Sequence, residues 1–248
     1  MLLPKSIILA NFSKSWGGGE KWFLLTGKEL IYRGWEVHYL VYPGSALHQR
    51  LVENKFPHHS LKIRFTSLLN PMKMSELRKL FLDMKPSYLF LNSSHELKVA
   101  WLVGQWWGIP NIILRRGLSF PFKSNPINHW YISHVLTAFL TNSQDSLHNF
   151  QEAFPKIQEK NPAVIRNGVD TSFYKPELQE PYKIGMASRL SPEKGIHLAI
   201  QAFAHLSNKE AQLHIWGTGE EENRLRNEAK KLGLEQRINF HGFEANLL

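Results

Sequence analysis

The stretch YKIGMASRLSPEKGIHLAIQAFAHL, residues 182–206, holds the pattern that recurs along the whole chain. Its first six residues form a short apolar run, which is typical of a buried strand. Its last eleven residues place Ile196, Ala199, Ile200 and Phe203 at helical spacing, so that one face of a helix is apolar. A strand, a short polar loop and an amphipathic helix in this order predict a parallel sheet covered by helices.

The loop of this stretch carries the signals of a helix start. Ser191 is a good N-cap residue, and the proline and glutamate that follow it suit the first helical turn. We therefore expect a helix from about Pro192 to Leu206. The capping signals do not explain the two cations on either side of them, Arg189 and Lys194.

Short apolar runs alternate with longer amphipathic stretches along the rest of the chain. Upstream, strands are expected at 6–10, 36–42, 60–64, 88–91, 111–114, 136–141 and 163–166, and helices include 19–33, 75–84, 94–107 and 143–154. Downstream, strands are expected at 182–187, 212–216 and 238–240, with helices at about 192–206 and 220–232. This alternation predicts an α/β fold of two doubly wound units with mostly parallel sheets.

The segment NGVDTSFYKPELQEPY, residues 167–182, contains a turn signal and two prolines and shows no periodicity. Such a segment is typical of a linker between domains. We expect residues 1–170 to form a first domain, 171–181 a linker and 182–248 a second domain. Ligands of such sheets bind beyond the carboxyl ends of the strands.

Arg189 and Lys194 lie where an expected strand ends and an expected helix begins. A cation in the first turn of a helix opposes the helix dipole, and a bound phosphate would remove that conflict. Arg189 would offer a planar fork of donors, and Lys194 would offer a point charge. The alternative is a solvated loop with two ordinary surface cations.

The stretch SWGGGEKWFLLTGKEL, residues 15–30, places three glycines between the first expected strand and a helix. Gly17, Gly18 and Gly19 permit positive φ and close approach of the backbone to a ligand. The spacing matches neither the G-x-G-x-x-G fingerprint nor a P-loop, which argues against NAD binding and ATP hydrolysis. A ligand-facing loop and a plain strand-to-helix turn both remain open.

Charge is distributed unevenly along the chain. Residues 1–170 contain 20 Lys and Arg against 11 Asp and Glu, whereas residues 171–248 contain 10 of each kind. The first part is therefore expected to face phosphates, an acidic glycan, lipid headgroups or nucleic acid, unless it is simply a soluble basic surface. Within residues 113–134, Arg115 and Arg116 are interleaved with aromatic residues, which suits a membrane contact, a sugar platform or a core.

The sequence lacks the motifs that are typical of several classes of function. The chain has no cysteine, which excludes disulfides, thiolate metal sites and cysteine nucleophiles. Its histidines form no H-E-x-x-H spacing, so no metal bound by side chains is expected, and no G-x-S-x-G hydrolase turn or nucleic-acid-binding motif is present. The longest apolar run, residues 99–110, is shorter than the roughly 20 residues that span a bilayer.

Together these features resemble the family 4 glycosyltransferases of GT-B architecture, also described as the glycosyltransferase group 1 type. The resemblance implies two Rossmann-like domains that move a sugar from a nucleotide-sugar donor, with retained anomeric configuration and without a cofactor or a metal. The segments that carry it are GGGEKW (17–22), IRNGVDTSFY (165–174), ASRLSPEKGIHLAIQAF (187–203) and IWGTGEEENRLRNEAKKLGLEQRINFHGF (215–243).

The resemblance also implies roles for single residues. Arg189 and Lys194 would bind the donor diphosphate and stabilise it as it leaves, so they are the expected catalytic residues. Gly217 and Gly219 would line the donor site. The acceptor-side residues would be Gly17, Gly18, Gly19, Glu20, Arg116 and His95, with Arg116 at the position where many family members have a histidine.

The segments RRGLSFPFK (115–123) and NGVD (167–170) resemble members that act on lipopolysaccharide cores and similar envelope glycans. We therefore expect a glycan or glycolipid acceptor and a cytoplasmic protein, peripheral on the inner face of the cytoplasmic membrane. The family's glutamate pair would lie past Leu248, so we expect a truncated donor domain with weak or absent activity. The alternative is a non-catalytic module that binds an anionic glycan or a membrane.

Overall fold

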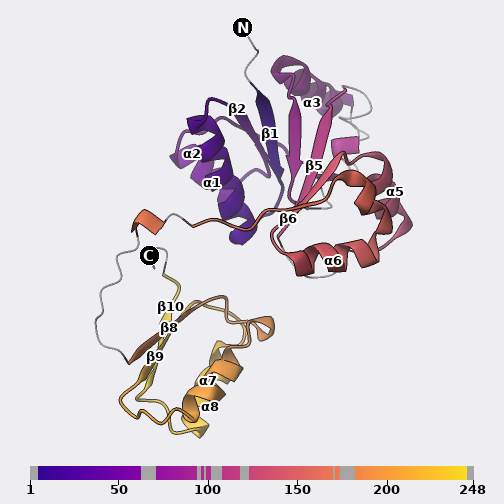
Figure 1. The fold of residues 1–248 in the computed structure, drawn as a ribbon. Coiled ribbons are helices and arrows are strands. Elements are labelled where there is room, and N and C mark those ends of the chain that lie inside the picture. The colour runs from indigo at the N-terminus through magenta and orange to yellow at the C-terminus, as the bar shows by residue number, and fades with distance from the viewer. Residues whose placement is uncertain are drawn as a thin grey trace. The chain divides into compact units, whose positions relative to one another are not determined.

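The computed structural model describes residues 5–62, 71–93, 96–97, 99–101, 108–117, 123–169, 171–173 and 182–244. The chain divides into two compact units, Met1–Gly168 and Val169–Leu248 (Figure 1). Part of the strand expected at 60–64 and most of the helix expected at 94–107 lie outside the described residues, as does His95.

The first unit is built on a seven-stranded sheet in which all neighbouring strands run parallel. The strand order is β3-β2-β1-β4-β5-β6-β7, so the direction of winding reverses between β1 and β4. The strands are β1 (Ser6–Asn11), β2 (Glu36–Val41), β3 (His58–Ser60), β4 (Tyr88–Leu91), β5 (Asn111–Arg116), β6 (Ala138–Thr141) and β7 (Ala163–Val164).

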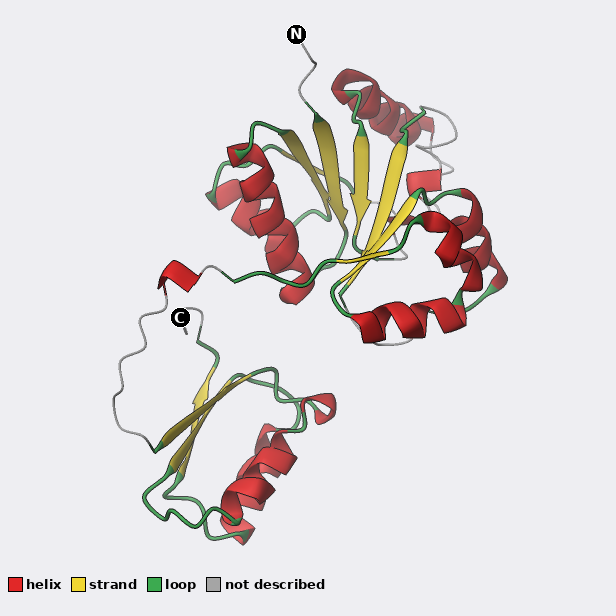
Figure 2. Ribbon diagram, viewed as in Figure 1, coloured by secondary structure: helices red, strands yellow, loops and turns green. Residues whose placement is uncertain are grey.

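Helices cover both faces of this sheet (Figure 2). They are α1 (Gly18–Tyr32), α2 (Ala46–Glu53), α3 (Pro71–Met84), α5 (Pro126–His134) and α6 (Gln144–Ala153). Side chains of α1 and α2 pack with Ile7 and Leu9 of β1, whereas those of α3, α5 and α6 belong to the cluster around Ile8 and Ala10. Both faces of β1 are therefore buried, which explains its continuous apolar sequence.

A tight contact joins α1 to β2. A Cβ atom at Gly27 would lie 1.9 Å from the Tyr39 hydroxyl oxygen, so no side chain fits there. The Tyr39 hydroxyl donates a hydrogen bond to the carbonyl oxygen of Leu24 at 3.0 Å. Burial raises the pKa of the Tyr39 phenol. Gly27 is thus needed for packing, because only glycine allows the helix to approach the strand this closely.

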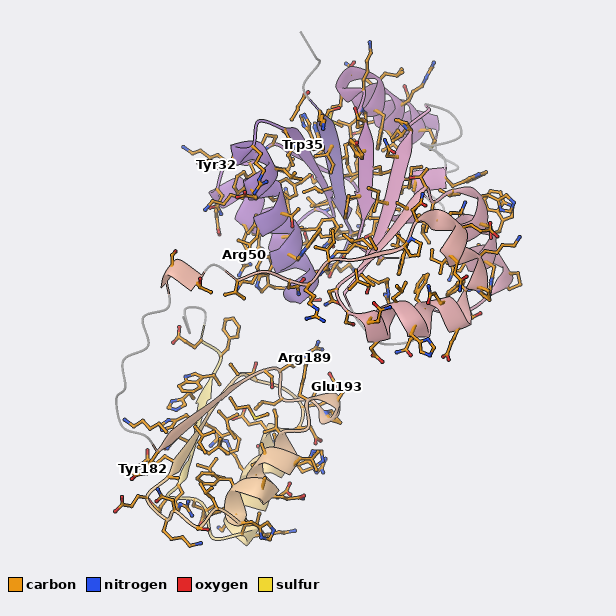
Figure 3. The ribbon with its side chains drawn as sticks, in the orientation of Figure 1. Tyr32, Trp35, Arg50, Tyr182, Arg189 and Glu193 are labelled. Carbon is orange, nitrogen blue, oxygen red and sulfur yellow. The ribbon has the colours of Figure 1, made fainter. Side chains whose placement is uncertain are left out.

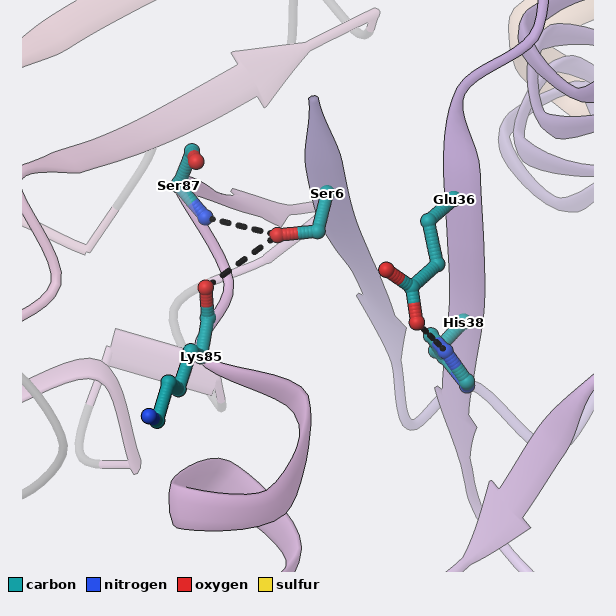
Figure 4. Close-up of polar contacts among 5 residues, drawn as sticks. All are labelled: Ser6, Glu36, His38, Lys85 and Ser87. Carbon is teal, nitrogen blue, oxygen red and sulfur yellow. Dashed lines mark hydrogen bonds and ion pairs between the residues drawn. The ribbon is translucent and has the colours of Figure 1, made fainter. Parts of the chain in front are cut away.

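Ser6 ties β1 to the connection that precedes β4 (Figure 4). Its hydroxyl donates to the carbonyl oxygen of Lys85 at 3.2 Å and accepts from the backbone N–H of Ser87 at 3.2 Å. On β2, Glu36 Oε1 and His38 Nε2 lie 3.2 Å apart. These contacts support the amino ends of the strands, which lie opposite the edge where such sheets bind ligands.

The second unit is a three-stranded parallel sheet with the order β10-β9-β8. Its elements are β8 (Lys183–Ala187), α7 (Ile196–Ala204), β9 (Gln212–Trp216), α8 (Glu222–Lys231) and β10 (Ile238–Gly242). Ile200 of α7 and Leu225 of α8 pack in one cluster with Leu213 and Ile215 of β9. Within the described ranges of both units, no helix is long and apolar enough to cross a bilayer.

The expected helix at 192–206 is divided in the structure. Pro192–Lys194 form a separate 3₁₀ turn, and α7 begins only at Ile196. Gly195 lies between them with a φ of 63°, in the left-handed region. The prediction of one continuous helix is wrong, because a left-handed residue interrupts the helical hydrogen bonds. The 3₁₀ turn and Gly195 end the β8–α7 loop, residues 188–195.

Candidate functional site

The β8–α7 loop leaves the carboxyl end of β8 and is paired through its backbone with the segment that follows β9. The N–H of Ser188 donates to the carbonyl oxygen of Trp216 at 3.0 Å. The N–H of Leu190 donates to Thr218 O at 3.0 Å, and Leu190 O accepts from the N–H of Glu221 at 3.1 Å. The two segments therefore support each other at the carboxyl edge of the second sheet.

Gly217 and Gly219 make this pairing possible. A Cβ atom at Gly217 would lie 1.8 Å from Ser188 O, and one at Gly219 would lie 2.1 Å from Leu190 O. Gly217 also has a φ of 133°, which residues with side chains rarely adopt. Both glycines, predicted as donor-site residues, thus pack against the residues on either side of Arg189.

Arg189 and Lys194 are both exposed (Arg189 is labelled in Figure 3). In the part of the chain that the structure describes, neither side chain has an ion-pair or hydrogen-bond partner. The prediction that Lys194 lies in the first turn of the following helix is wrong, because Lys194 belongs to the 3₁₀ turn before Gly195, the N-cap of α7. What remains is a pair of exposed cations, neither of them in an ion pair among the described residues, on a loop held by backbone hydrogen bonds.

Ser191 does not cap α7, contrary to the prediction, because Gly195 occupies that position. The side chain of Ser191 is buried, and its hydroxyl donates to Glu193 Oε1 at 2.6 Å. The Ser191 hydrogen bond lowers the pKa of the exposed Glu193 carboxyl, and the charges of Arg189 and Lys194 add to the effect. The Glu193 carboxylate therefore interacts electrostatically with both cations, and Figure 3 labels Glu193 and Arg189 on the same loop.

In the first unit, Gly17, Gly18 and Gly19 connect β1 to α1 at the carboxyl edge of the sheet. Gly17 is the N-cap of α1 and has an extended backbone, and none of the three has a positive φ. A Cβ atom at Gly17 would lie 3.2 Å from Glu20 Oε2, and one at Gly19 would lie 3.2 Å from Asn92 Nδ2. The glycines thus leave room for polar side chains and do not use the left-handed conformation that they permit.

Glu20 lies in the first turn of α1 and is buried. Its Oε1 accepts hydrogen bonds from Asn11 Nδ2 at 3.3 Å and from Asn92 Nδ2 at 3.5 Å. Asn11 ends β1 and Asn92 follows β4, so Glu20 links the two strands between which the winding reverses. The family resemblance implied a role for Glu20 but for neither asparagine, although each asparagine comes at the end of an apolar strand.

Arg115 contributes a buried cation to the same edge. Its side chain is 4% exposed, and its guanidinium carbon lies 4.2 Å from the ring centroid of Trp22. Arg115 Nη2 donates to Asn167 Oδ1 at 3.3 Å. Burial lowers the pKa of Arg115 to about 10, while the charge of Glu20 acts in the opposite direction. The prediction of a basic and aromatic surface therefore fails at Arg115, which β5 holds inside the unit.

Other residues of the predicted acceptor side have different surroundings. Arg116, at the end of β5, is half-buried, and burial lowers its pKa. Among the aromatic residues of the same segment, Trp130 of α5 is 42% exposed, whereas Tyr131 is buried. His95 lies outside the described residues, as do the phenylalanines at 120 and 122.

Glu96 is a buried carboxyl that the sequence did not reveal. Its Oε1 accepts from the backbone N–H of Phe12 at 2.8 Å, and its Oε2 accepts from the N–H of Ser93 at 2.7 Å. Burial raises the pKa of Glu96, and these hydrogen bonds oppose the shift. Glu96 thus joins the segments that follow β1 and β4.

A cavity of about 410 Å³ lies away from these residues. It is lined by His58, His59, Ser60, Leu61, Glu76, Lys79, Leu80 and Asp83, which come from β3, the residue after it and α3. It contains none of the predicted site residues. Among the residues placed by the structure, no group of three or more His, Asp or Glu side chains could hold a metal ion.

Two family models match the chain. The model described as Glycosyltransferase Family 4 matches residues 16–173, and the model described as Glycosyl transferases group 1 matches residues 170–247. The chain belongs to glycosyltransferase family 4. Its membership confirms the resemblance of the glycine stretch and the β8–α7 loop to this family.

The fold is that of solved GT-B glycosyltransferases. HepE of Anabaena in complex with UDP-glucose has a TM-score of 0.73 at 20% identity, covering 97% of this chain and 69% of HepE. The apo lipopolysaccharide outer core galactosyltransferase WaaB has a TM-score of 0.67 at 16% identity, covering 97% of this chain and 68% of WaaB.

One curated relative matches a part of the sequence. The GtfA subunit of the UDP-N-acetylglucosamine--peptide N-acetylglucosaminyltransferase of Streptococcus gordonii is 28% identical over 109 residues. The match covers 42% of this chain and 22% of GtfA, so the chain spans about a fifth of that relative.

Proposed function

We propose that the chain moves a sugar from a nucleotide-sugar donor to a hydroxyl group of a glycan or glycolipid. Membership of glycosyltransferase family 4 supports this reaction class. HepE is named with UDP-glucose, and GtfA is named for UDP-N-acetylglucosamine, which makes UDP-sugars the first donors to test.

The observation that carries the proposal is the unpaired state of Arg189 and Lys194 within the described residues, on a loop held by backbone pairing. A nucleoside diphosphate gains negative charge as it leaves the sugar. Cations that are already in place stabilise such charge without reorganisation. Arg189 and Lys194 would therefore bind the donor diphosphate and assist its departure, with anomeric retention and no metal requirement, as the family resemblance implies.

The acceptor is proposed to be an anionic envelope glycan of the lipopolysaccharide type, at the inner face of the cytoplasmic membrane. The surplus of 20 Lys and Arg over 11 Asp and Glu in residues 1–170 supports an anionic partner. The fold shared with WaaB, which is named as a lipopolysaccharide outer core enzyme, supports the acceptor class. Gly17 to Gly19, Glu20 and Arg116 would form the acceptor side.

The test is calorimetric titration of the chain with UDP-, GDP- and ADP-sugars. At least one donor should bind, and Arg189→Ala with Lys194→Ala should weaken that binding about 10- to 100-fold, because two charge-assisted contacts are lost. Lys230→Ala with Lys231→Ala is the matched control: both lysines are exposed on α8. Binding by no donor, or equal effects of the two double variants, would contradict the proposal.

The second candidate function is a non-catalytic module that binds an anionic glycan or membrane through the first unit. The same charge surplus in residues 1–170 favours it. This alternative predicts binding to anionic surfaces by a chain that binds no nucleotide sugar.

A further inference from the structure

We infer that Ser191 holds the Glu193 carboxylate as a fixed counter-charge beside Arg189 and Lys194, and that this counter-charge sets the affinity of the loop for a nucleoside diphosphate. The inference rests on the proposed function, because it requires the diphosphate to bind at Arg189 and Lys194. Ser191 would be a positioning residue, since it acts only through Glu193.

The geometry makes Ser191 an anchor and Glu193 the group that it restrains. Ser191 is 7% exposed, and its hydroxyl donates to Glu193 Oε1 at 2.6 Å. The turn is closed by hydrogen bonds from the N–H of Lys194 to Ser191 O at 3.0 Å and from the N–H of Gly195 to Pro192 O at 3.2 Å. Glu193 is exposed, and among the described residues the Ser191 hydroxyl is the one side-chain group that donates a hydrogen bond to its carboxylate, which also accepts from the backbone N–H of Glu193.

The hydrogen bond from Ser191 affects diphosphate binding because it restrains the negative charge of Glu193. A carboxylate and a phosphate are both anions, and they compete for the same guanidinium and ammonium donors. Glu193 forms an ion pair with neither Arg189 nor Lys194 within the described part of the chain. Held by Ser191, the carboxylate repels a bound diphosphate but leaves both cations free. If the carboxylate were released from Ser191, it would pair with Arg189 and Lys194 and compete directly with the diphosphate for them.

Two substitutions should therefore change affinity in opposite directions. Glu193→Gln removes the counter-charge and should tighten UDP binding about two- to fivefold, the range typical of an exposed charge pair. Ser191→Ala frees the carboxylate and should weaken UDP binding about two- to fivefold. In the double variant the freed side chain has no charge, so its affinity should match that of Glu193→Gln.

The experiment is calorimetric titration of the full chain with UDP, at low salt and again at high salt. Ser191→Thr keeps a hydroxyl and should bind UDP as the wild type does. Glu210→Gln controls for the loss of one negative charge, because Glu210 is exposed and precedes β9 at the opposite edge of the sheet. High salt should reduce the differences between variants, because it screens exposed charges.

The outcomes separate this inference from the function on which it rests. If UDP fails to bind, the same titrations are made with GDP and ADP. If none of the three nucleotides binds, or if Arg189→Ala with Lys194→Ala leaves binding unchanged, the diphosphate site and the counter-charge are both overturned. Suppose that Arg189→Ala with Lys194→Ala weakens UDP binding, while Ser191→Ala and Glu193→Gln change the affinity in the same direction or not at all. In that case only the counter-charge is overturned. The counter-charge would also be overturned if Ser191→Ala bound UDP with the same affinity as Ser191→Ala with Glu193→Gln.

Discussion

Glu20, Glu96 and Arg115 are buried ionisable side chains at one edge of the first sheet. Burial of a charge is costly unless hydrogen bonds or an opposite charge compensate it, and groups of this kind concentrate at functional sites. Glu20 and Glu96 each connect the segments after β1 and β4, where the winding reverses. These residues therefore keep the proposed acceptor edge rigid.

Glu96 should give the stability of the protein a measurable pH dependence. Burial raises the folded-state pKa of Glu96, so its contribution is fully present below the unfolded-state pKa and is lost as pH rises through the folded-state pKa. Glu96→Gln does not titrate. The free energy of unfolding of the wild type, relative to that of Glu96→Gln, should therefore fall as the pH rises from the unfolded-state pKa through the folded-state pKa of Glu96.

Urea unfolding at each pH measures this difference. Glu53→Gln, at an exposed glutamate of α2, controls for the loss of one negative charge. A wild-type advantage that grows with pH would show that hydrogen bonds, and not burial, dominate the pKa of Glu96.

Sequence alone could identify some of these residues and not others. Arg189 and Lys194 stand out locally, because the helix-start signals between them do not account for two cations. Asn92 and Glu96 do not, because each bonds to a residue that is remote in sequence: Asn92 donates to Glu20, 72 positions away, and Glu96 accepts from the N–H of Phe12, 84 positions away. Such contacts depend on which strands are neighbours, and single-residue patterns do not contain that information.

At the scale of elements, the apolar periodicity located most strands and helices, and the expected strands at 88–91 and 212–216 coincide with β4 and β9. The main error was the continuous helix at 192–206. Proline and glutamate after a serine indicate a helix start, but Gly195 takes a left-handed conformation and delays α7. The break places Lys194 in the loop, and not on the helix.

The contact between α1 and β2 should be sensitive to the size of residue 27. Gly27→Ala would put a methyl group 1.9 Å from the Tyr39 hydroxyl oxygen, so the helix must move away from the sheet. We expect a loss of about 1 to 3 kcal/mol in the free energy of unfolding, measured with urea.

Gly18→Ala is the matched control, because a Cβ atom there would meet nothing within 4 Å. Tyr39→Phe removes the nearest clashing atom, so Gly27→Ala should cost less in that background. Equal losses for Gly18→Ala and Gly27→Ala would show that packing does not require glycine at position 27.

At the scale of the whole molecule, the βα alternation was sufficient to predict an α/β protein with two parallel sheets, which the structure confirms. The order of the strands was not predictable in the same way. Winding reverses between β1 and β4, and helices pack on both faces of β1, but the sequence shows only that both faces are apolar.

The basic first unit should bind anionic membranes if the acceptor is reached at a membrane surface. Ile127 of α5 is 62% exposed, three residues before the exposed Trp130 of the same helix, and offers an apolar contact on the unit that carries the surplus of positive charge. The full chain should cosediment with phosphatidylglycerol vesicles but not with phosphatidylcholine vesicles, and salt should weaken the binding.

Ile127→Ser should reduce this vesicle binding about three- to tenfold, because the apolar contact is lost. Val52→Ser is the control at another exposed apolar residue, on α2. Failure to bind phosphatidylglycerol vesicles at low salt would argue against a membrane-surface location.

The central claim is that Arg189 and Lys194 hold the diphosphate of the donor. The most direct measurement compares the affinities of UDP, GDP and ADP with those of uridine, guanosine and adenosine, for the wild type and for Arg189→Ala with Lys194→Ala. For the nucleotide that binds, we expect the affinity advantage of the diphosphate over its nucleoside to disappear largely in the double variant. The same advantage should persist in Lys230→Ala with Lys231→Ala. An affinity advantage of the same size in all three proteins would show that Arg189 and Lys194 do not hold the diphosphate.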